Sequence, residues 1–336
     1  MSQQIRVVKK RLKRKDYVAF YLYLLFVLLS LFVMASYTWF SLSRTPSVSN
    51  MNVYITSATG LELSADPGED NWQLQLSVWD TGCIPTELRP VTWSEKDGRF
   101  WAASYGSDGR LMDYAQWQPL TDSRHANTVT TDGYYMKSTF YARSGMRTEV
   151  RFAPAMVVDE AGTQGSGTYV IGVASWDMEG LLHLNSGKGA ESAIRIGLRA
   201  TPVDSSGTPT GSSGGMFLYE PNADRHVGDS SGYIKTPSID GTDTLVPEER
   251  MVLQTASGWA DLETPEISSI KLTLGEFITN PVLFTVEPGQ VMKIELYIWL
   301  EGQDVDCVNP MNGAQLMANL QFTGTTDTQS GMVTIE

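Results

Sequence analysis

The sequence predicts an all-β fold, a jelly-roll-like β-sandwich preceded by one N-terminal hydrophobic helix. Nine Trp, fourteen Tyr and eleven Phe residues stand beside many Thr, Val and Gly residues, a composition typical of β-proteins. Roughly sixteen short runs of alternating apolar and polar residues are separated by turn residues, which is the pattern of a sandwich or jelly roll. One long uncharged stretch, from Tyr17 to Phe40, comes before all of these runs.

The uncharged stretch predicts a transmembrane anchor or a signal segment. As a helix with a rise of ~1.5 Å per residue it extends roughly 36 Å, enough for a hydrocarbon core of about 30 Å. It follows a basic region that holds one acidic residue, Asp16, and seven basic ones: Arg6, Lys9, Lys10, Arg11, Lys13, Arg14 and Lys15. Because basic residues stay on the cytoplasmic side, residues 1–16 are expected inside and everything after Arg44 outside.

Retention and cleavage of residues 17–40 stay open as alternatives. A signal peptide has a hydrophobic stretch of about 7–15 residues and a small residue at its cleavage site. Ala35 before Ser36 offers such a site, whereas the greater length of the stretch favours an anchor. In both cases the membrane is a partner through residues 17–40, and the rest of the chain works on the extracellular side of the plasma membrane, anchored there or released to the cell surface.

The charge of the chain is divided very unequally. The first forty residues hold seven of the 25 Lys and Arg residues and one of the 38 Asp and Glu residues, so the remainder has 18 basic and 37 acidic side chains and a formal charge of −19. Such an acidic exterior repels phosphate groups, which excludes nucleic acid as a partner bound through charge. It suits a protein that is soluble outside the cell, and it is compatible with divalent cations.

The two cysteines, Cys83 and Cys307, both follow the hydrophobic segment. A pair of cysteines in an oxidising compartment is able to form a disulfide, here one that joins early and late parts of the ectodomain. We therefore expect this bridge, with two free thiols as the alternative if the host is anaerobic.

Residues 41–50 form a polar spacer, and residues 51–336 are expected to form the extracellular sandwich. Alternation predicts its first strands over Met51–Thr56, Leu61–Ser64 and Trp72–Trp79. The third of these strands is expected to place four side chains on one face: Trp72, Leu74, Leu76 and Val78.

Several features occur together around the start of the ectodomain: the basic start, the hydrophobic segment ending in Thr38-Trp39-Phe40, the Ser-rich spacer and the stretch NMNVYITSATGLELSAD from Asn50 to Asp66. In these features the chain resembles the TasA/camelysin family of secreted or surface β-sandwich proteins from Gram-positive bacteria. Members form biofilm matrix fibres by lending an N-terminal strand to the next subunit. The resemblance thus implies copies of the chain as partners and a donor strand containing Asn52, Val53, Tyr54, Ile55, Leu61 and Leu63.

The later part of the chain predicts further strands around one long loop-rich excursion, residues 202–250. The expected strands are Arg99–Tyr105, Tyr134–Tyr141, Arg147–Phe152, Thr168–Trp176, Ala190–Thr201 (half-buried), Ser268–Leu274, Val282–Val286, Val291–Leu300, Gln315–Phe322 and Gly331–Ile335. In Val291–Leu300 the face expected to lie in the core contains Met292, Ile294, Leu296, Ile298 and Leu300. Within the excursion, residues 204–215 are expected to be a flexible low-complexity loop.

No catalytic residue is predicted. The three histidines, His125, His183 and His226, are far apart in sequence and no His-Glu-x-x-His motif contains them. The protease activity assigned to camelysin therefore has no recognised metal motif here. Gly-x-Ser-x-Gly and P-loop motifs are also absent from the sequence.

The most distinctive short stretch is WLEGQDVDC, from Trp299 to Cys307. Its three carboxylates, Glu301, Asp304 and Asp306, follow a predicted strand and are the hard oxygen ligands that Ca²⁺ prefers. Calcium is therefore the one metal considered, and no other cofactor is expected. The favoured interpretation is an acidic turn without a metal, fixed by Gly302 and Cys307, and calcium binding is the alternative.

These observations predict an extracellular structural or matrix protein of the bacterial cell surface, forming fibres by N-terminal donor-strand exchange. The alternative is a membrane-tethered binding module for glycan or calcium that stays monomeric. An enzyme is the least favoured class, because the sequence shows no recognisable catalytic motif.

Overall fold

The computed structural model describes residues 14–42, 46–57, 60–68, 70–83, 87–94, 98–106, 111–112, 116–127, 133–153, 156–157, 164–177, 180–186, 189–222, 233–236, 244–247, 252–255, 258–261, 272–273, 276–277, 282–308 and 312–326. The chain forms two compact units, Met1–Arg44 and Thr45–Glu336. The expected strand Gly331–Ile335 and His226 lie outside the described residues.

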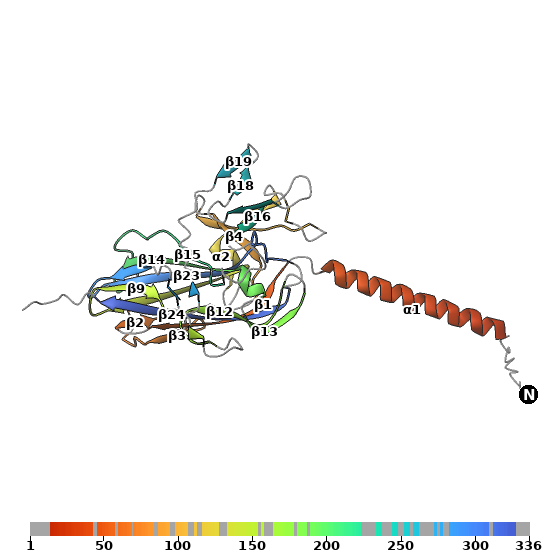
Figure 1. Cartoon of the computed structure of the whole chain (residues 1–336), viewed down its shortest axis with the longest axis horizontal. Coiled ribbons are helices and arrows are strands. Elements are labelled where there is room, and N and C mark those ends of the chain that lie inside the picture. The colour runs from red at the N-terminus through yellow and green to blue at the C-terminus, as the bar shows by residue number, and fades with distance from the viewer. Residues whose placement is uncertain are drawn as a thin grey trace, which may run out of the picture. The chain divides into compact units, whose positions relative to one another are not determined.

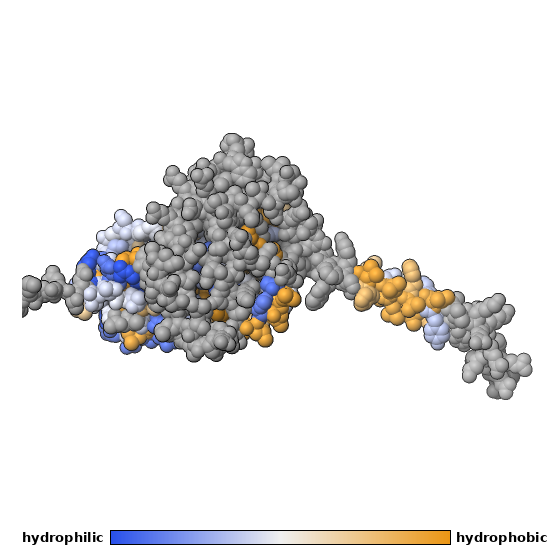
Figure 2. Space-filling view, in the orientation of Figure 1, coloured by the Kyte–Doolittle hydropathy of each residue, from blue (hydrophilic) through white to orange (hydrophobic). Residues whose placement is uncertain are grey.

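The first unit contains one α-helix, α1 (Arg14–Leu42). Its side chains are described from residue 20 to residue 34, and the large apolar ones among them are mostly exposed, with Phe20 59% and Met34 66% accessible. Figure 2 shows this part of the helix as mostly hydrophobic surface. Judged on the described residues alone, no helix combines the length and the hydropathy needed to cross a membrane.

The second unit is built mostly of strands in two sheets, which confirms the all-β class. The first sheet has seven strands in the order β13-β12-β24-β1-β3, with β9 pairing β24 and β22 pairing β9. Its strands are β1 (Val48–Ser57), β3 (Gln75–Ser77), β9 (Thr148–Phe152), β12 (Tyr169–Trp176), β13 (Leu182–Ser186), β22 (Phe284–Val286) and β24 (Ala314–Thr326).

The second sheet has nine strands in the order β15-β14-β23-β4-β5-β6, and β8 pairs with β23, β2 and β7. These strands are β2 (Leu61–Ser64), β4 (Pro90–Ser94), β5 (Arg99–Ala102), β6 (Gln118–Pro119), β7 (Ala126–Asn127), β8 (Tyr135–Ser144), β14 (Ile194–Val203), β15 (Phe217–Tyr219) and β23 (Val291–Glu301). Between β6 and β7 lies the short helix α2 (Asp122–His125).

Two long strands organise the unit, β23 in one sheet and β24 in the other (Figure 1). One edge of β24 pairs first with β12 and then with β9. Similarly, one edge of β23 pairs first with β8 and then with β4. Side chains from both sheets meet in one large apolar core. The predicted core face of β23 is confirmed, because Met292, Ile294, Leu296, Ile298 and Leu300 are all buried there.

A second buried cluster covers the other face of the nine-stranded sheet. We call it the aromatic cluster, and its rings are those of Trp93, Phe100, Tyr135, Tyr297 and Trp299. Phe100 lies at its centre, with ring centroids 4.1 Å from Tyr135 and 5.1 Å from Trp299. Tyr297 and Trp299, which alternate with the core residues of β23, are therefore buried as well.

Two expectations about strands are wrong in detail. The expected strand Trp72–Trp79 shortens to β3, and Leu74 is 58% exposed instead of sharing a buried face with Leu76. The stretch from Ala190 begins with a 3₁₀ turn, η2 (Ala190–Ala193), and β14 follows it. Because β14 is covered on both faces, it is more deeply buried than the half-buried strand predicted from its alternation.

The excursion around residues 202–250 begins with an ordered turn. The Oδ1 atom of Asp204 accepts hydrogen bonds from the backbone N–H groups of Ser206 and Thr208, both at 2.9 Å. An Asx-type turn thus follows β14 directly, and the flexibility of residues 204–215 stays a prediction. The remaining elements form two-stranded pairs: β10 (Met156–Val157) with β11 (Gln164–Ser166), β16 (Tyr233–Thr236) with β17 (Thr244–Pro247), β18 (Val252–Thr255) with β19 (Gly258–Asp261), and β20 (Leu272–Thr273) with β21 (Glu276–Phe277).

Candidate functional site

The WLEGQDVDC stretch forms a buried turn at the end of β23. The backbone N–H of Asp304 donates to the carbonyl of Glu301, and that of Cys307 donates to the carbonyl of Asp304, both at 3.1 Å. All residues from Glu301 to Cys307 are buried. We call residues 301–307 the acidic turn.

Glu301 is held by three donors. The Thr92 hydroxyl and the backbone N–H of Gln303 donate to its Oε1, and the indole N–H of Trp299 donates to its Oε2 at 3.0 Å. Complete burial nevertheless raises the pKa of Glu301, because desolvation of the charged carboxylate outweighs these hydrogen bonds and the nearby charge of Arg195. The carboxylate therefore has little capacity left for another ligand.

Asp304 pairs with a buried arginine. The Nη2 of Arg195 lies 2.6 Å from the Oδ2 of Asp304 and 3.0 Å from the Oε1 of Glu220. The other guanidinium nitrogen donates to the backbone carbonyls of Ser192 and Ile194. One cation thus lies between two carboxylates, and the other oxygen of Asp304 accepts the backbone N–H of Asp306 at 2.8 Å.

Two of the three carboxylates considered as calcium ligands, those of Glu301 and Asp304, are held by protein groups. Among the described residues, no group of three or more His, Cys, Asp or Glu side chains is arranged to hold a metal ion. The physical reason is visible in the contacts: Glu301 and Asp304 bind protein donors, and a guanidinium already supplies the positive charge that a cation would bring. These contacts favour a turn fixed by internal interactions, and calcium binding stays a prediction.

Gly302 and Tyr105 connect the acidic turn to the surface. A Cβ atom on Gly302 would lie 2.5 Å from the Cβ of Ala103 and 3.2 Å from that of Pro90, so only glycine fits between the turn and the β4–β5 hairpin. The hydroxyl of Tyr105 donates to the carbonyl of Gly302 at 2.7 Å. Burial, followed by the proximity of Cys307, raises the pKa of Tyr105 well above its ordinary value.

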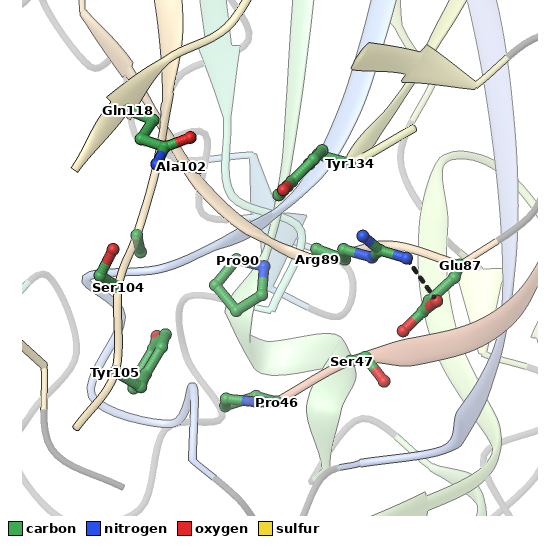
Figure 3. Close-up of a pocket in the computed structure, with 11 residues that line it drawn as sticks. Pro46, Ser47, Glu87, Arg89, Pro90, Ala102, Ser104, Tyr105, Gln118 and Tyr134 are labelled. Atoms are coloured by element: carbon green, nitrogen blue, oxygen red, sulfur yellow. Dashed lines mark hydrogen bonds and ion pairs between the residues drawn. The ribbon is translucent and has the colours of Figure 1, made fainter. Parts of the chain in front are cut away.

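A cleft of about 460 Å³ opens beside Tyr105 (Figure 3). It lies between the residues that lead into β1 and those of β4 and β5. The described residues that line it are Pro46, Ser47, Glu87, Arg89, Pro90, Ala102, Ala103, Ser104, Tyr105, Gln118 and Tyr134.

The cleft combines one ion pair with aromatic and hydroxyl groups. Arg89 lies 3.3 Å from Glu87 and its guanidinium stands 5.2 Å from the ring centre of Tyr134. Burial lowers the pKa of Arg89, but the charge and hydrogen bond of Glu87 outweigh this and hold the pKa above its ordinary value. Among the described lining residues Glu87 is the single carboxylate, so they offer no carboxylate pair of the kind used to cleave glycosidic bonds.

Ser175 on β12, His183 on β13 and Asp177 directly after β12 lie together without forming a nucleophile–base pair. The strand register places Ser175 opposite His183, and His183 Nε2 lies 2.8 Å from Asp177 Oδ2. The Ser175 hydroxyl, however, donates to the buried carboxylate of Glu191 at 2.7 Å. Hydroxyl activation needs a hydrogen bond to the imidazole, and here that hydroxyl points to a carboxylate instead.

The expected disulfide is not formed. Cys83 and Cys307 are both buried free thiols with separate neighbours. The Sγ of Cys83 lies 3.5 Å from the carbonyl of Asn127, and the Sγ of Cys307 lies 3.3 Å from the hydroxyl of Tyr105. Burial raises the pKa of Cys83 to about 11.

The donor-strand candidates lie within the unit's own two sheets. Val53 and Ile55 are buried on β1, and Leu61 and Leu63 are buried on β2. Tyr54 is 43% exposed and Asn52 also faces outward, as strand alternation requires. In the structure β1 pairs with β24 and β3 of the same chain.

Sequence reasoning missed Arg195, Glu220 and Arg89 as members of these sites. Arg195 alternates with isoleucines in β14, and that pattern is read as a solvated face when the cover over the sheet is unknown. The available signal was a basic residue between two isoleucines, at the start of a strand in an acidic domain.

Comparisons with known proteins give no match: no protein-family model, no curated protein and no solved structure is similar to this chain.

Proposed function

We propose that this chain is a non-enzymatic structural protein of the bacterial cell surface. In this proposal residues 17–40 insert in the plasma membrane, and the two sheets form a jelly-roll-like sandwich on the extracellular side. The observation that carries the proposal is the position of β1 inside the seven-stranded sheet. This strand starts at Val48, shortly after the hydrophobic segment, and is fully integrated between β24 and β3. The segment that follows the anchor is therefore part of the folded body.

The proposed membrane anchor is supported by sequence and by exposure. No charged residue or histidine occurs between Tyr17 and Phe40, and most of the described large apolar side chains of α1 are exposed. Exposed apolar surface of this extent is costly in water and favourable in lipid.

Fractionation of cells that make the full chain tests the anchor. We expect the protein in the membrane pellet after alkaline carbonate washing, with its N-terminal residues intact. A mature N-terminus between Ser36 and Ser41 would show release, and a soluble protein with the intact N-terminus would refute the anchor.

Fibre formation by exchange of β1 is the second candidate. The observation that favours it is the position of β1: it is near the start of the ectodomain, and its removal would leave β24 with an unpaired edge that an identical strand fits. Domain swapping replaces each contact by the same contact from a neighbour, so its equilibrium cost is small. Because Met51, Val53 and Ile55 are buried, however, β1 must leave the core before it is exchanged.

A disulfide between β1 and β24 distinguishes the two candidates. Asn52 pairs with Met317 in the strand register, and neighbouring strands lie about 4.8 Å apart, within the range that a disulfide spans. The variant Asn52→Cys/Met317→Cys should bind β1 to its own domain when oxidised. If fibres grow by strand exchange, the reduced variant forms them and the oxidised variant does not. Fibres from the oxidised variant would exclude exchange of β1.

The cleft supports the remaining alternative, a tethered binding module. Its tyrosine rings, hydroxyl groups and amide are the groups that hold a small polar ligand such as a glycan. Surface-derived oligosaccharides should then raise the melting temperature of the protein, and Tyr134→Phe, which removes only a hydroxyl, should reduce that increase. Calcium is tested in the same assay, with Asp304→Asn as the variant.

A further inference from the structure

We propose that the β1–β24 pair is a mechanical clamp that resists tension along the chain. The strands are parallel, so tension between the hydrophobic segment and the C-terminal end of β24 acts on their whole ladder in shear. The source of the tension rests on the proposed function, because a chain held in a membrane at one end is pulled by whatever engages its other end. The resistance itself follows from the fold.

The register between β1 and β24 shows how tension would act on the two strands. Val48 pairs with Ala314 at one end of the ladder, and Ser57 pairs with Phe322 at the other. The chain enters β1 at Val48 and leaves β24 after Thr326. Tension therefore enters and leaves at opposite ends of the ladder. In an antiparallel pair it would act at one end and separate the residue pairs one after another.

The side chains prevent gradual sliding. Met51, Val53 and Ile55 are buried in the main core, and so are Leu316, Ala318 and Leu320 opposite them. A slip of one residue turns every core side chain of a strand to the wrong face. The strands therefore cannot move apart stepwise, and the paired residues must separate together.

Both strands are also held by other neighbours. The edge of β24 that faces away from β1 pairs with β12 along its first half and with β9 along its second half. On its other side β1 pairs with β3, and Val48 exchanges two backbone hydrogen bonds with Leu88 at 3.0 and 2.8 Å. Figure 1 shows β24 running lengthwise through the body of the unit. The load on β1 is thus transferred to a strand fixed in the centre of its sheet.

Optical-tweezers measurements on the full chain in detergent micelles test the clamp. Handles at Met1 and Glu336 load β1 and β24 in shear. Handles at Gly289 and Glu336 are the control. Gly289 and the end of β24 lie at the same end of the unit, because Thr148 pairs with both Thr326 and Val286. In this control the force separates the end of β24 from its neighbouring strands one residue pair at a time, instead of loading the β1–β24 ladder in shear.

We expect a severalfold higher rupture force for the Met1–Glu336 handles than for the Gly289–Glu336 handles at the same loading rate. Forced unfolding reports the unfolding barrier along the pulled direction, so the rupture force can differ between the two handle pairs independently of equilibrium stability. Equal forces, or a lower force for the Met1–Glu336 handles, would overturn the proposal.

Two matched variants locate the resistance. Ile55→Val and Ile298→Val remove one methyl group each from isoleucines that are equally buried, one on β1 and the other on β23. Ile55→Val should lower the rupture force between Met1 and Glu336, whereas Ile298→Val should leave it near the unchanged value. An equal decrease in both variants would place the barrier elsewhere. The force measurement needs no membrane, so its result and that of fractionation stand independently.

Discussion

The guanidinium of Arg195 lies 2.6 Å from the carboxylate of Asp304, with 4% and 0% of the two side chains exposed. Glu220 is the second anion at the same nitrogen and is 2% exposed. These residues come from β14, from the segment after β15 and from the acidic turn after β23. One buried cation thus connects three parts of the chain that are distant in sequence.

Replacing Arg195 by methionine should destabilise the protein strongly. The variant Arg195→Met keeps much of the side-chain volume but leaves two buried carboxylates without their cation. Breaking a buried ion pair by removal of one partner costs roughly 3–5 kcal/mol. We expect this decrease in the free energy of unfolding from urea titrations followed by tryptophan fluorescence. Arg199→Met, in the same strand but half-buried, is the control and should change stability by less than about 1 kcal/mol. A loss of similar size in both variants would contradict the structural role of Arg195.

The strand face that packs in the main core was predictable from alternation along the strand. In β23 the alternation of Ile294, Leu296 and Ile298 with polar residues identified the buried face correctly. The burial of Tyr297 and Trp299 was not predictable, because their cover comes from β4 and β5, which lie some two hundred residues earlier in the chain. Arg195 was likewise predicted to lie on a solvated face, because the residues that cover it are distant in sequence.

The chemistry of the acidic turn was the least predictable part. Three carboxylates after a strand are compatible with a cation, an arginine or solvent, and the local sequence does not distinguish these. The partner of Asp304 is separated from it by 109 positions. Similarly, an even number of cysteines does not show whether Cys83 and Cys307 meet, because pairing depends on positions in the folded core.

The variant Glu301→Gln tests whether the acidic turn needs a charged or a neutral group. Three donors point at the two carboxylate oxygens of Glu301, and an amide has one oxygen only. The NH₂ group of glutamine would therefore face a donor. An unsatisfied buried polar group costs roughly 1–3 kcal/mol, so we expect a decrease of that size in the free energy of unfolding.

The control for this variant is Glu287→Gln. Glu287 forms an exposed pair with Arg147 at 3.2 Å, and exposed pairs contribute about 0–1 kcal/mol. If Glu301→Gln is as stable as the control variant, Glu301 is protonated in the folded protein at neutral pH and shares its proton with a neighbour.

Lys137 lies between two carboxylates beside the aromatic cluster. Its Nζ is 2.7 Å from Asp122 and 3.0 Å from Glu295. Burial raises the pKa of each carboxyl group, but the hydrogen bonds and charge of Lys137 outweigh burial, together with Tyr135 and Tyr297 at Asp122 and with Lys293 at Glu295. Both pKa values therefore lie below their ordinary range. Groups with a lowered folded-state pKa stabilise the protein above their unfolded pKa of about 4, and this stabilisation is lost as the pH falls.

The variant Lys137→Met should therefore shift the acid transition to higher pH. Without the ammonium group, burial dominates and the pKa values of Asp122 and Glu295 rise, so stability begins to decrease at a less acidic pH. Melting temperatures measured from neutral pH down to pH 3 report the midpoint of this decrease. Arg147→Met, which removes an exposed partner of Glu287, is the control and should leave the midpoint unchanged. An unchanged midpoint in Lys137→Met would show that Lys137 does not set the two pKa values.

The two thiols should be free but protected. Cys83 and Cys307 are buried, and the pKa of Cys83 is raised to about 11, so little reactive thiolate is present in the folded protein. Iodoacetamide at mildly alkaline pH should leave the native chain unmodified. In concentrated urea without reductant, mass spectrometry should find two carbamidomethyl groups. If the unfolded chain reacts only after addition of a reductant, the cysteines are bridged, and the separate contacts of Cys83 with Asn127 and of Cys307 with Tyr105 do not describe the oxidised protein.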